Sequence, residues 1–155
     1  IKGISPNIYR SHVGQVLPEQ HPFEGTILEN ITFGNPSISA ERVNEVIKRL
    51  GLISFVKKQT EGLNTMLYAQ GQHIPYTVSK RIILARAIVH EPRLLFLKDP
   101  LEHFEASEAR DIVSYLTDDS HPWAIVVASG NPIWKNKCAH ILTLPQGILK
   151  KNENA

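Results

Sequence analysis

Apolar residues recur with the 3.6-residue period of an α-helix in the first half of the chain. They occupy positions i, i+3, i+4 and i+7 of one stripe, at Val43, Val46, Ile47 and Leu50. Ser39 precedes this stripe as an N-cap, and Gly51 follows it as the residue at which such a helix ends. The pattern predicts a helix between these two residues and a short second helix at about 53–58.

Two more stripes of this kind lie further along the chain. One begins around Ser79, with Thr77 or Ser79 as its N-cap, and it should stop by His90, because the residue before a proline avoids helical geometry. The apolar positions of the other stripe are Ala106, Ala109, Ile112, Val113 and Leu116. Each stripe predicts a helix with one buried face.

Short apolar runs between the helical stripes predict β-strands. The runs at 94–97 and 124–128 are continuous, which is typical of parallel strands covered on both faces. A weaker alternation at 12–17 predicts a third strand, and 140–144 followed by a turn and Ile148-Leu149 predicts a closing hairpin. Alternating strands and helices favour an α/β fold, and we expect the four strands at 12–17, 93–98, 123–128 and 140–144 to share one largely parallel sheet.

Composition narrows the function classes without naming one. The 155 residues suit a single domain, and 17 basic against 15 acidic residues give a net charge of +2, too small to predict nucleic-acid binding. The seven histidines and the single cysteine do not form a zinc-binding pattern. No apolar run approaches the roughly 20 residues that span a bilayer, so we expect any membrane to be reached through another domain or chain.

The most specific signal is the stretch 21–43, His-Pro-Phe-Glu-Gly-Thr-Ile-Leu-Glu-Asn-Ile-Thr-Phe-Gly-Asn-Pro-Ser-Ile-Ser-Ala-Glu-Arg-Val. It resembles the segment that follows the glutamine loop in the nucleotide-binding domains of ABC exporters. Ala-Arg-Ala at 85–87, Pro-Arg-Leu-Leu-Phe-Leu at 92–97 and Cys-Ala-His-Ile-Leu-Thr-Leu at 138–144 follow in the order and spacing of that family. The resemblance covers nearly the whole chain, from residue 13 to about 149.

The resemblance implies a P-loop NTPase (RecA-like) core with the helical subdomain of ABC proteins. A helical subdomain with the signature helix would occupy about 26–90, and the C-terminal part of the core would occupy 91–150. The phosphate-cradling pattern Gly-x-x-x-x-Gly-Lys-[Ser/Thr] does not occur in the chain. Since the family carries that loop upstream, we expect the N-terminal part of the domain to be missing here.

Two loops of the family that contact nucleotide are altered in this sequence. Pro18 stands at the glutamine that helps to hold Mg²⁺, and it has no side-chain donor or acceptor, although Gln20 lies nearby as a substitute. The signature loop, normally Leu-Ser-Gly-Gly-Gln, reads Ile74-Pro-Tyr-Thr-Val78. Pro75 removes an amide donor and Tyr76 adds a ring where the backbone must approach phosphate closely, so we expect phosphate recognition to be lost at this loop.

The family's catalytic strand is altered as well. Lys98 stands at the aspartate that supports Mg²⁺, and Asp99 stands at the catalytic glutamate, one methylene shorter. Glu105 keeps the acidic character of the D-loop, and Gly130 replaces the switch histidine. Changes at separate positions predict a lost catalytic apparatus, with Asp99 as a structural carboxylate; the alternative is that Asp99 is a working base.

These observations predict a degenerate nucleotide-binding domain of an exporter of peptides, toxins, lipids or drugs, with a structural or regulatory role and little or no ATP hydrolysis. The resemblance implies ATP and Mg²⁺ as ligands of the family. It also implies, as partners, a second nucleotide-binding domain and the coupling helices of a transmembrane domain, at the cytoplasmic face of the membrane. Two alternatives stay open: an ATPase that works once its N-terminal part and partner are present, and a soluble interaction module.

Overall fold

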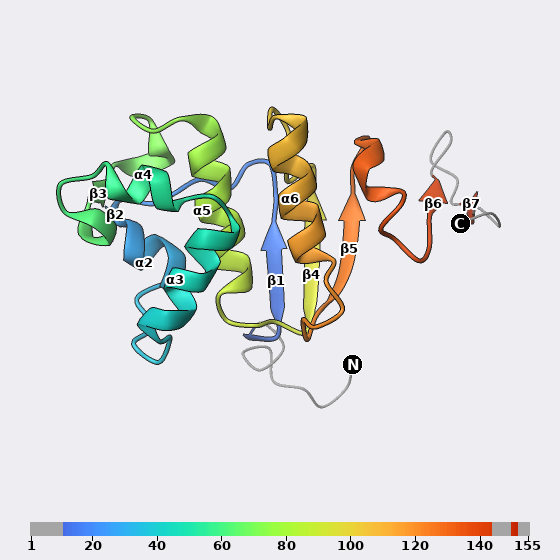
Figure 1. The fold of residues 1–155 in the computed structure, drawn as a ribbon, viewed down its shortest axis with the longest axis horizontal. Coiled ribbons are helices and arrows are strands. Elements are labelled where there is room, and N and C mark those ends of the chain that lie inside the picture. The colour runs from blue at the N-terminus through green and yellow to red at the C-terminus, as the bar shows by residue number, and fades with distance from the viewer. Residues whose placement is uncertain (1–10, 144–149, 152–155) are drawn as a thin grey trace.

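Three parallel strands form the central sheet of the computed structural model, which describes residues 11–143 and 150–151. The strands are β1 (Val13–Val16), β4 (Leu94–Lys98) and β5 (Ala124–Ala128), in the order β1-β4-β5 (Figure 1). Both neighbouring pairs are parallel, with Leu94 opposite Val13 on one side and opposite Ala124 on the other. The α/β fold and three of the four predicted core strands are confirmed.

The fourth predicted strand does not join this sheet. β6 (Leu142–Thr143) pairs antiparallel with β7 (Lys150–Lys151) in a separate two-stranded sheet. The prediction of a core strand at 140–144 is therefore wrong, whereas the antiparallel pair agrees with a hairpin. The physical reason is that a hairpin closes a short loop, while pairing with β5 needs a crossover connection. The second hairpin strand predicted at Ile148-Leu149 lies outside the described residues.

The two faces of the central sheet differ in cover. Leu95 and Leu97 are 0% and 2% exposed, whereas Phe96 on the opposite face is 38% exposed and its neighbour Val126 is 52% exposed. On the covered face the α5 backbone comes so close that a Cβ at Gly14 would lie 2.3 Å from a carbonyl oxygen of α5. The prediction that these strands are covered on both faces is therefore wrong for one face.

The first predicted helix is confirmed together with both of its ends. It is α3 (Ala40–Arg49), and the Ser39 hydroxyl accepts from the Arg42 backbone N–H at 3.2 Å. At the other end Gly51 adopts φ +68°, and the Leu52 N–H donates to the Ile47 carbonyl at 2.8 Å, which is the Schellman ending. The short helix α4 (Ile53–Lys57) and the helix α6 (Ala106–Leu116) also lie where the pattern predicts them.

The helix α5 (Tyr76–Ile88) starts three residues earlier than predicted. Pro75 holds the N-cap position and no side chain caps this helix, so the prediction that Thr77 or Ser79 caps it is wrong. The Ser79 backbone N–H instead donates to the Pro75 carbonyl at 3.0 Å, which places Ser79 inside the first turns, and its buried hydroxyl has no hydrogen-bond partner. The fixed φ of proline suits the entrance to a helix.

A helical lobe lies beside the sheet, on the left in Figure 1. Besides α3, α4 and α5 it contains the helix α2 (Ile27–Thr32) and the short strands β2 (Gly25–Thr26) and β3 (Met66–Leu67), which pair antiparallel. Short 3₁₀ turns at Gly62–Asn64, Ala69–Gly71 and Pro132–Trp134 complete the described elements. None of the helices in the described part of the chain is both long and apolar enough to cross a membrane.

Candidate functional site

A cavity of about 360 Å³ opens where β4 and β5 end. The loop after β4 and the loop after β5 form its walls, and its lining residues are Asp99, Leu101, Glu102, His103, Ser129, Gly130 and Asn131. Ligand sites of open parallel sheets lie at this carboxyl edge of the strands. The cavity therefore brings together two of the predicted site positions, Asp99 and Gly130.

Asp99 is held in the cavity wall by its backbone. Its φ is +41°, a left-handed conformation that is uncommon for a residue with a side chain, and its N–H donates to the Ala128 carbonyl at 3.0 Å. Lys98 is exposed at the end of β4, and within the described residues neither Lys98 nor Asp99 takes part in an ion pair. Among the residues that the structure describes, Asp99 therefore lines the cavity without an ion-pair partner.

Gly130 and Glu105 contribute no side chain to this cavity. A Cβ built at Gly130 would meet no atom within 4 Å, so the position has room for a side chain and simply lacks one. Glu105 holds the N-cap position of α6 without capping it, is exposed, and does not line the cavity. The acid predicted for the D-loop is thus separate from Asp99 in this structure.

Gln20 closes the turn after β1 through hydrogen bonds with Leu17. The Gln20 side-chain oxygen accepts from the Leu17 N–H at 2.9 Å, and the Gln20 N–H donates to the Leu17 carbonyl at 3.1 Å. Pro18 between them is half-buried and Gln20 does not line the cavity. The side chain that the sequence offers as a substitute for the family's glutamine is therefore occupied by the loop itself.

The residues Ile74 to Val78 form the entrance to α5 and lie apart from the cavity lining. Ile74 is half-buried and its N–H donates to the Gly71 carbonyl at 3.2 Å, while Thr77 and Val78 are half-buried in the first helical turn. Tyr76 is 41% exposed, and its ring stands edge-on to the ring of His103, with centroids 5.4 Å apart. Burial raises the pKa of the Tyr76 hydroxyl, and the charge of Glu102 adds to this effect.

The sequence reasoning misses two residues of this region, Lys80 and His103. Lys80 is only 3% exposed, and its Nζ donates to the carbonyls of Pro18 at 2.5 Å and of Gln20 at 3.2 Å. His103 lies between the cavity and Tyr76. A lysine one helical turn after an aromatic residue indicates a contact between the ammonium and the ring. In a sequence, however, the same spacing is equally typical of a solvent-exposed helix face.

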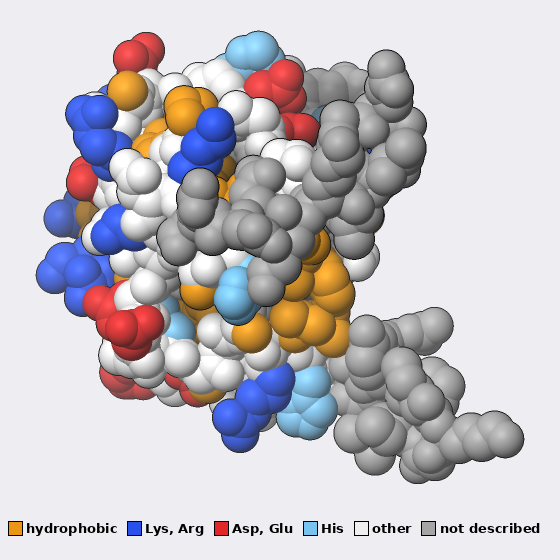
Figure 2. All heavy atoms as spheres, turned by 90° about the vertical axis from the view of Figure 1, so that its right-hand side faces the viewer, with side chains coloured by type: hydrophobic (Ala, Val, Ile, Leu, Met, Phe, Trp, Pro, Cys, Tyr) orange, Lys and Arg blue, Asp and Glu red, His pale blue; other side chains and the backbone are white. Residues whose placement is uncertain are grey.

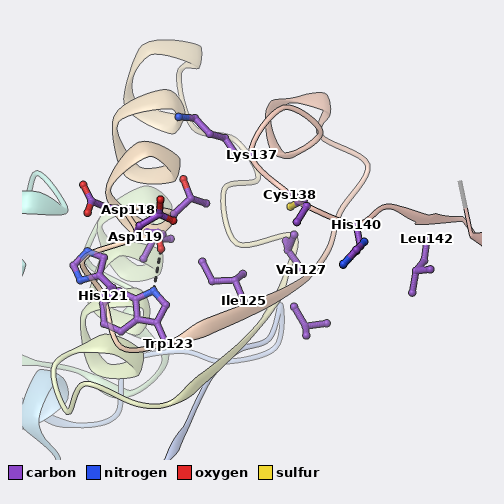
Figure 3. Close-up of a pocket in the computed structure, with 14 residues that line it drawn as sticks. Asp118, Asp119, His121, Trp123, Ile125, Val127, Lys137, Cys138, His140 and Leu142 are labelled. Atoms are coloured by element: carbon purple, nitrogen blue, oxygen red, sulfur yellow. Dashed lines mark hydrogen bonds between the residues drawn. The ribbon is translucent and has the colours of Figure 1, made fainter. Parts of the chain in front are cut away.

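A second hollow of about 550 Å³ lies along the outer edge of β5, between the end of α6 and the chain after Trp134 (Figure 3). His121 stacks on Trp123 with ring centroids 4.1 Å apart, and the Trp123 indole N–H donates to the Leu116 carbonyl at 2.9 Å. Figure 2, which faces this side, shows hydrophobic side chains gathered next to the grey residues. Within residues 11–143 and 150–151, no group of three or more His, Cys, Asp or Glu side chains is placed to hold a metal ion.

Sequences of known proteins align with most of this chain. No model of a protein family matches the chain. An export ATP-binding/permease protein of Rickettsia bellii is 32% identical over 115 residues, which are 74% of this chain and 20% of that protein. The exotoxin translocation ATP-binding protein PaxB of Pasteurella aerogenes is 26% identical over 142 residues, 92% of this chain and 20% of that protein.

A solved structure is similar in fold. The structure of a bacterial Atm1-family ABC exporter with ATP bound aligns with a TM-score of 0.79 at 25% identity, over 90% of this chain and 24% of that one. The chain thus spans about a fifth of the length of the two relatives named above.

Proposed function

Because the chain belongs to the nucleotide-binding-type domains of ABC exporters, we propose that it is a degenerate domain of an exporter that hydrolyses ATP poorly or not at all. One observation carries this proposal. Asp99 and Gly130 both line the cavity at the ends of β4 and β5, Gly130 offers no side chain there, and the residue before Asp99 is Lys98. The role of this chain is then structural or regulatory within the assembled transporter.

The ligands implied by the family are ATP and Mg²⁺, and the described residues do not fit Mg²⁺. Lys98 puts a positive charge at the position that would support the cation. Two like unit charges about 4 Å apart repel by about 4 kcal/mol at an effective dielectric of 20, and the double charge of Mg²⁺ doubles this repulsion. Asp99 is one carboxylate, and no cluster of acidic, histidine or cysteine side chains surrounds it among the described residues.

Titration calorimetry with Mg·ATP tests this proposal on the 155-residue chain. We expect a dissociation constant above about 100 μM, and an affinity several times higher for Lys98→Asp, because that change replaces repulsion of the cation by attraction. The control is Lys135→Asp, the same charge change at an exposed lysine outside the cavity lining. A dissociation constant below about 100 μM for the unaltered chain would refute the degenerate reading.

The surface we propose for the transmembrane partner lies in the helical lobe. Phe23 and Phe33 stack with ring centroids 5.9 Å apart, and the guanidinium of Arg86 lies 5.1 Å and 4.8 Å from the two centroids. Phe33 is 63% exposed and Phe23 is 38% exposed, so two aromatic rings stand at the surface in a fixed geometry. Rigid exposed aromatic residues are typical anchors of protein interfaces, which supports contact with the coupling helices at the cytoplasmic face of a membrane.

The second candidate function, an ATPase that works in the complete transporter, is favoured by the retained carboxylate. Asp99 lines a cavity at the sheet edge where parallel-sheet proteins bind ligands, and no cationic side chain neutralises it within the described residues. A carboxylate of this kind acts as a base only when its water lies within about 2.6–3.2 Å. Substitution of Asp99 in the assembled transporter separates the two functions.

A further inference from the structure

Lys80 joins two segments that are far apart in the sequence. It lies in the second turn of α5, yet its Nζ donates to the carbonyls of Pro18 and Gln20 in the turn after β1. These two carbonyls receive no other hydrogen bond from the described residues. The Lys80 ammonium therefore holds the turn 17–20 against the helix α5.

The Lys80 ammonium is buried and therefore needs hydrogen-bond acceptors from the protein. Lys80 is 3% exposed, and no carboxylate lies within ion-pair distance of its Nζ among the described residues. A buried ammonium without a counter-ion is costly unless its protons are donated, so the two carbonyls are required to keep it there. Burial lowers the pKa of Lys80, while the charges of Glu102 and Glu19 oppose that shift.

Tyr76 connects the Lys80 ammonium to the surface. Its ring centroid lies 5.3 Å from the Lys80 Nζ, which is a cation–π contact, and its edge contacts His103 of the loop after β4. Since Tyr76 is 41% exposed at the first turn of α5, a protein surface that packs there touches the same ring. A displacement of that ring removes one of the three contacts that hold the Lys80 ammonium.

We propose that Lys80 is a positioning residue that clamps the turn 17–20 onto α5, and that the Tyr76 ring supports this clamp through its contact with the ammonium. The clamp itself needs neither nucleotide nor partner. The position of the turn therefore depends on one ammonium and one aromatic ring.

Hydrogen exchange followed by mass spectrometry on the 155-residue chain tests the clamp. Lys80→Met keeps the aliphatic stem and removes the donors. We expect the amides of 17–22, which are those of Leu17, Glu19, Gln20 and His21 because residues 18 and 22 are prolines, to exchange about tenfold faster. Amides of β4 should change by less than about twofold. Lys80→Arg, which keeps a charge and donors, should restore most of the protection, and Lys57→Met on α4 should change nothing in 17–22.

A second pair of variants keeps the test decisive if Lys80→Met fails to fold. Tyr76→Leu removes the ring and should speed exchange in 17–22 by about two- to fivefold, whereas Tyr76→Phe keeps the ring and should not. Equal exchange in 17–22 for Tyr76→Leu and Tyr76→Phe, or an equal increase throughout the chain for Lys80→Met, would overturn the proposal. Tight Mg·ATP binding in the calorimetric test would overturn the proposed function and leave this result unaffected.

Discussion

Gly51 lies where the end of α3 meets Arg81 of α5. Its φ of +68° suits glycine, and a Cβ there would lie 2.3 Å from Nη1 of Arg81. That nitrogen donates to the Leu50 carbonyl at 2.6 Å, and Nη2 of the same guanidinium pairs with Glu108 on α6 at 2.6 Å. Gly51→Ala should therefore lower the free energy of unfolding by about 2–3 kcal/mol, since backbone strain adds to displacement of a bonded guanidinium. Urea unfolding measures this change.

Gly62 provides the matched control for Gly51. Its φ is +55°, and a Cβ there would meet nothing within 4 Å. Gly62→Ala should cost only the backbone strain, about 1 kcal/mol. Equal losses for the two substitutions would mean that the Arg81 contact contributes nothing.

Single residues also show what the sequence can and cannot reveal about the site. Gly51 is predictable, because the residue that ends a helix is a local matter of backbone conformation. Asp99 and Gly130 are predictable as neighbours through the family resemblance, and both line the cavity. Lys80 is not predictable, because its partners are backbone carbonyls some 60 residues away, whose position depends on the whole fold.

Hydrogen bonds from Arg86 connect the helices α2 and α5. Its Nε donates to the Asn30 carbonyl at 2.7 Å and its Nη2 to the Asn30 side-chain oxygen at 2.8 Å, and Asn30 is fully buried. Burial lowers the pKa of Arg86 to about 10. Arg86→Met should reduce the free energy of unfolding by about 2–4 kcal/mol, because it removes the donor to the Asn30 carbonyl and leaves the buried Asn30 side-chain oxygen with the Phe23 N–H alone. Thermal or urea unfolding measures the loss, and Arg110→Met at an exposed site should stay within about 0.5 kcal/mol.

Element boundaries follow the sequence where the signals are local. Ser39 and Gly51 delimit α3 as the pattern predicts, whereas α5 begins at Tyr76 because proline entry takes the place of a side-chain cap. The strand at 140–144 is mispredicted, since an apolar run does not specify its pairing partner. Pairing of distant strands is decided by tertiary contacts rather than by local pattern.

In the molecule as a whole, one face of the central sheet exposes apolar side chains. Phe96 and Val126 lie side by side on it, 38% and 52% exposed. An apolar sheet face of this kind binds hydrophobic dyes and promotes association. Phe96→Thr with Val126→Thr should lower the fluorescence of bound anilinonaphthalene sulfonate about twofold or more, while Met66→Thr, at an exposed residue of the helical lobe, should change it little. Unchanged fluorescence in the double variant would show that the dye binds elsewhere.

We propose that this domain does not itself carry ATP hydrolysis in an assembled exporter. The most direct measurement is the ATPase rate of an assembled exporter that contains the chain, with Asp99→Asn compared with the equivalent carboxylate-to-amide change in the partner domain. We predict that Asp99→Asn changes the rate by less than about twofold, whereas the partner substitution abolishes turnover, because only the partner would then hold a working base. Loss of turnover on Asp99→Asn would contradict the account and establish Asp99 as a catalytic base.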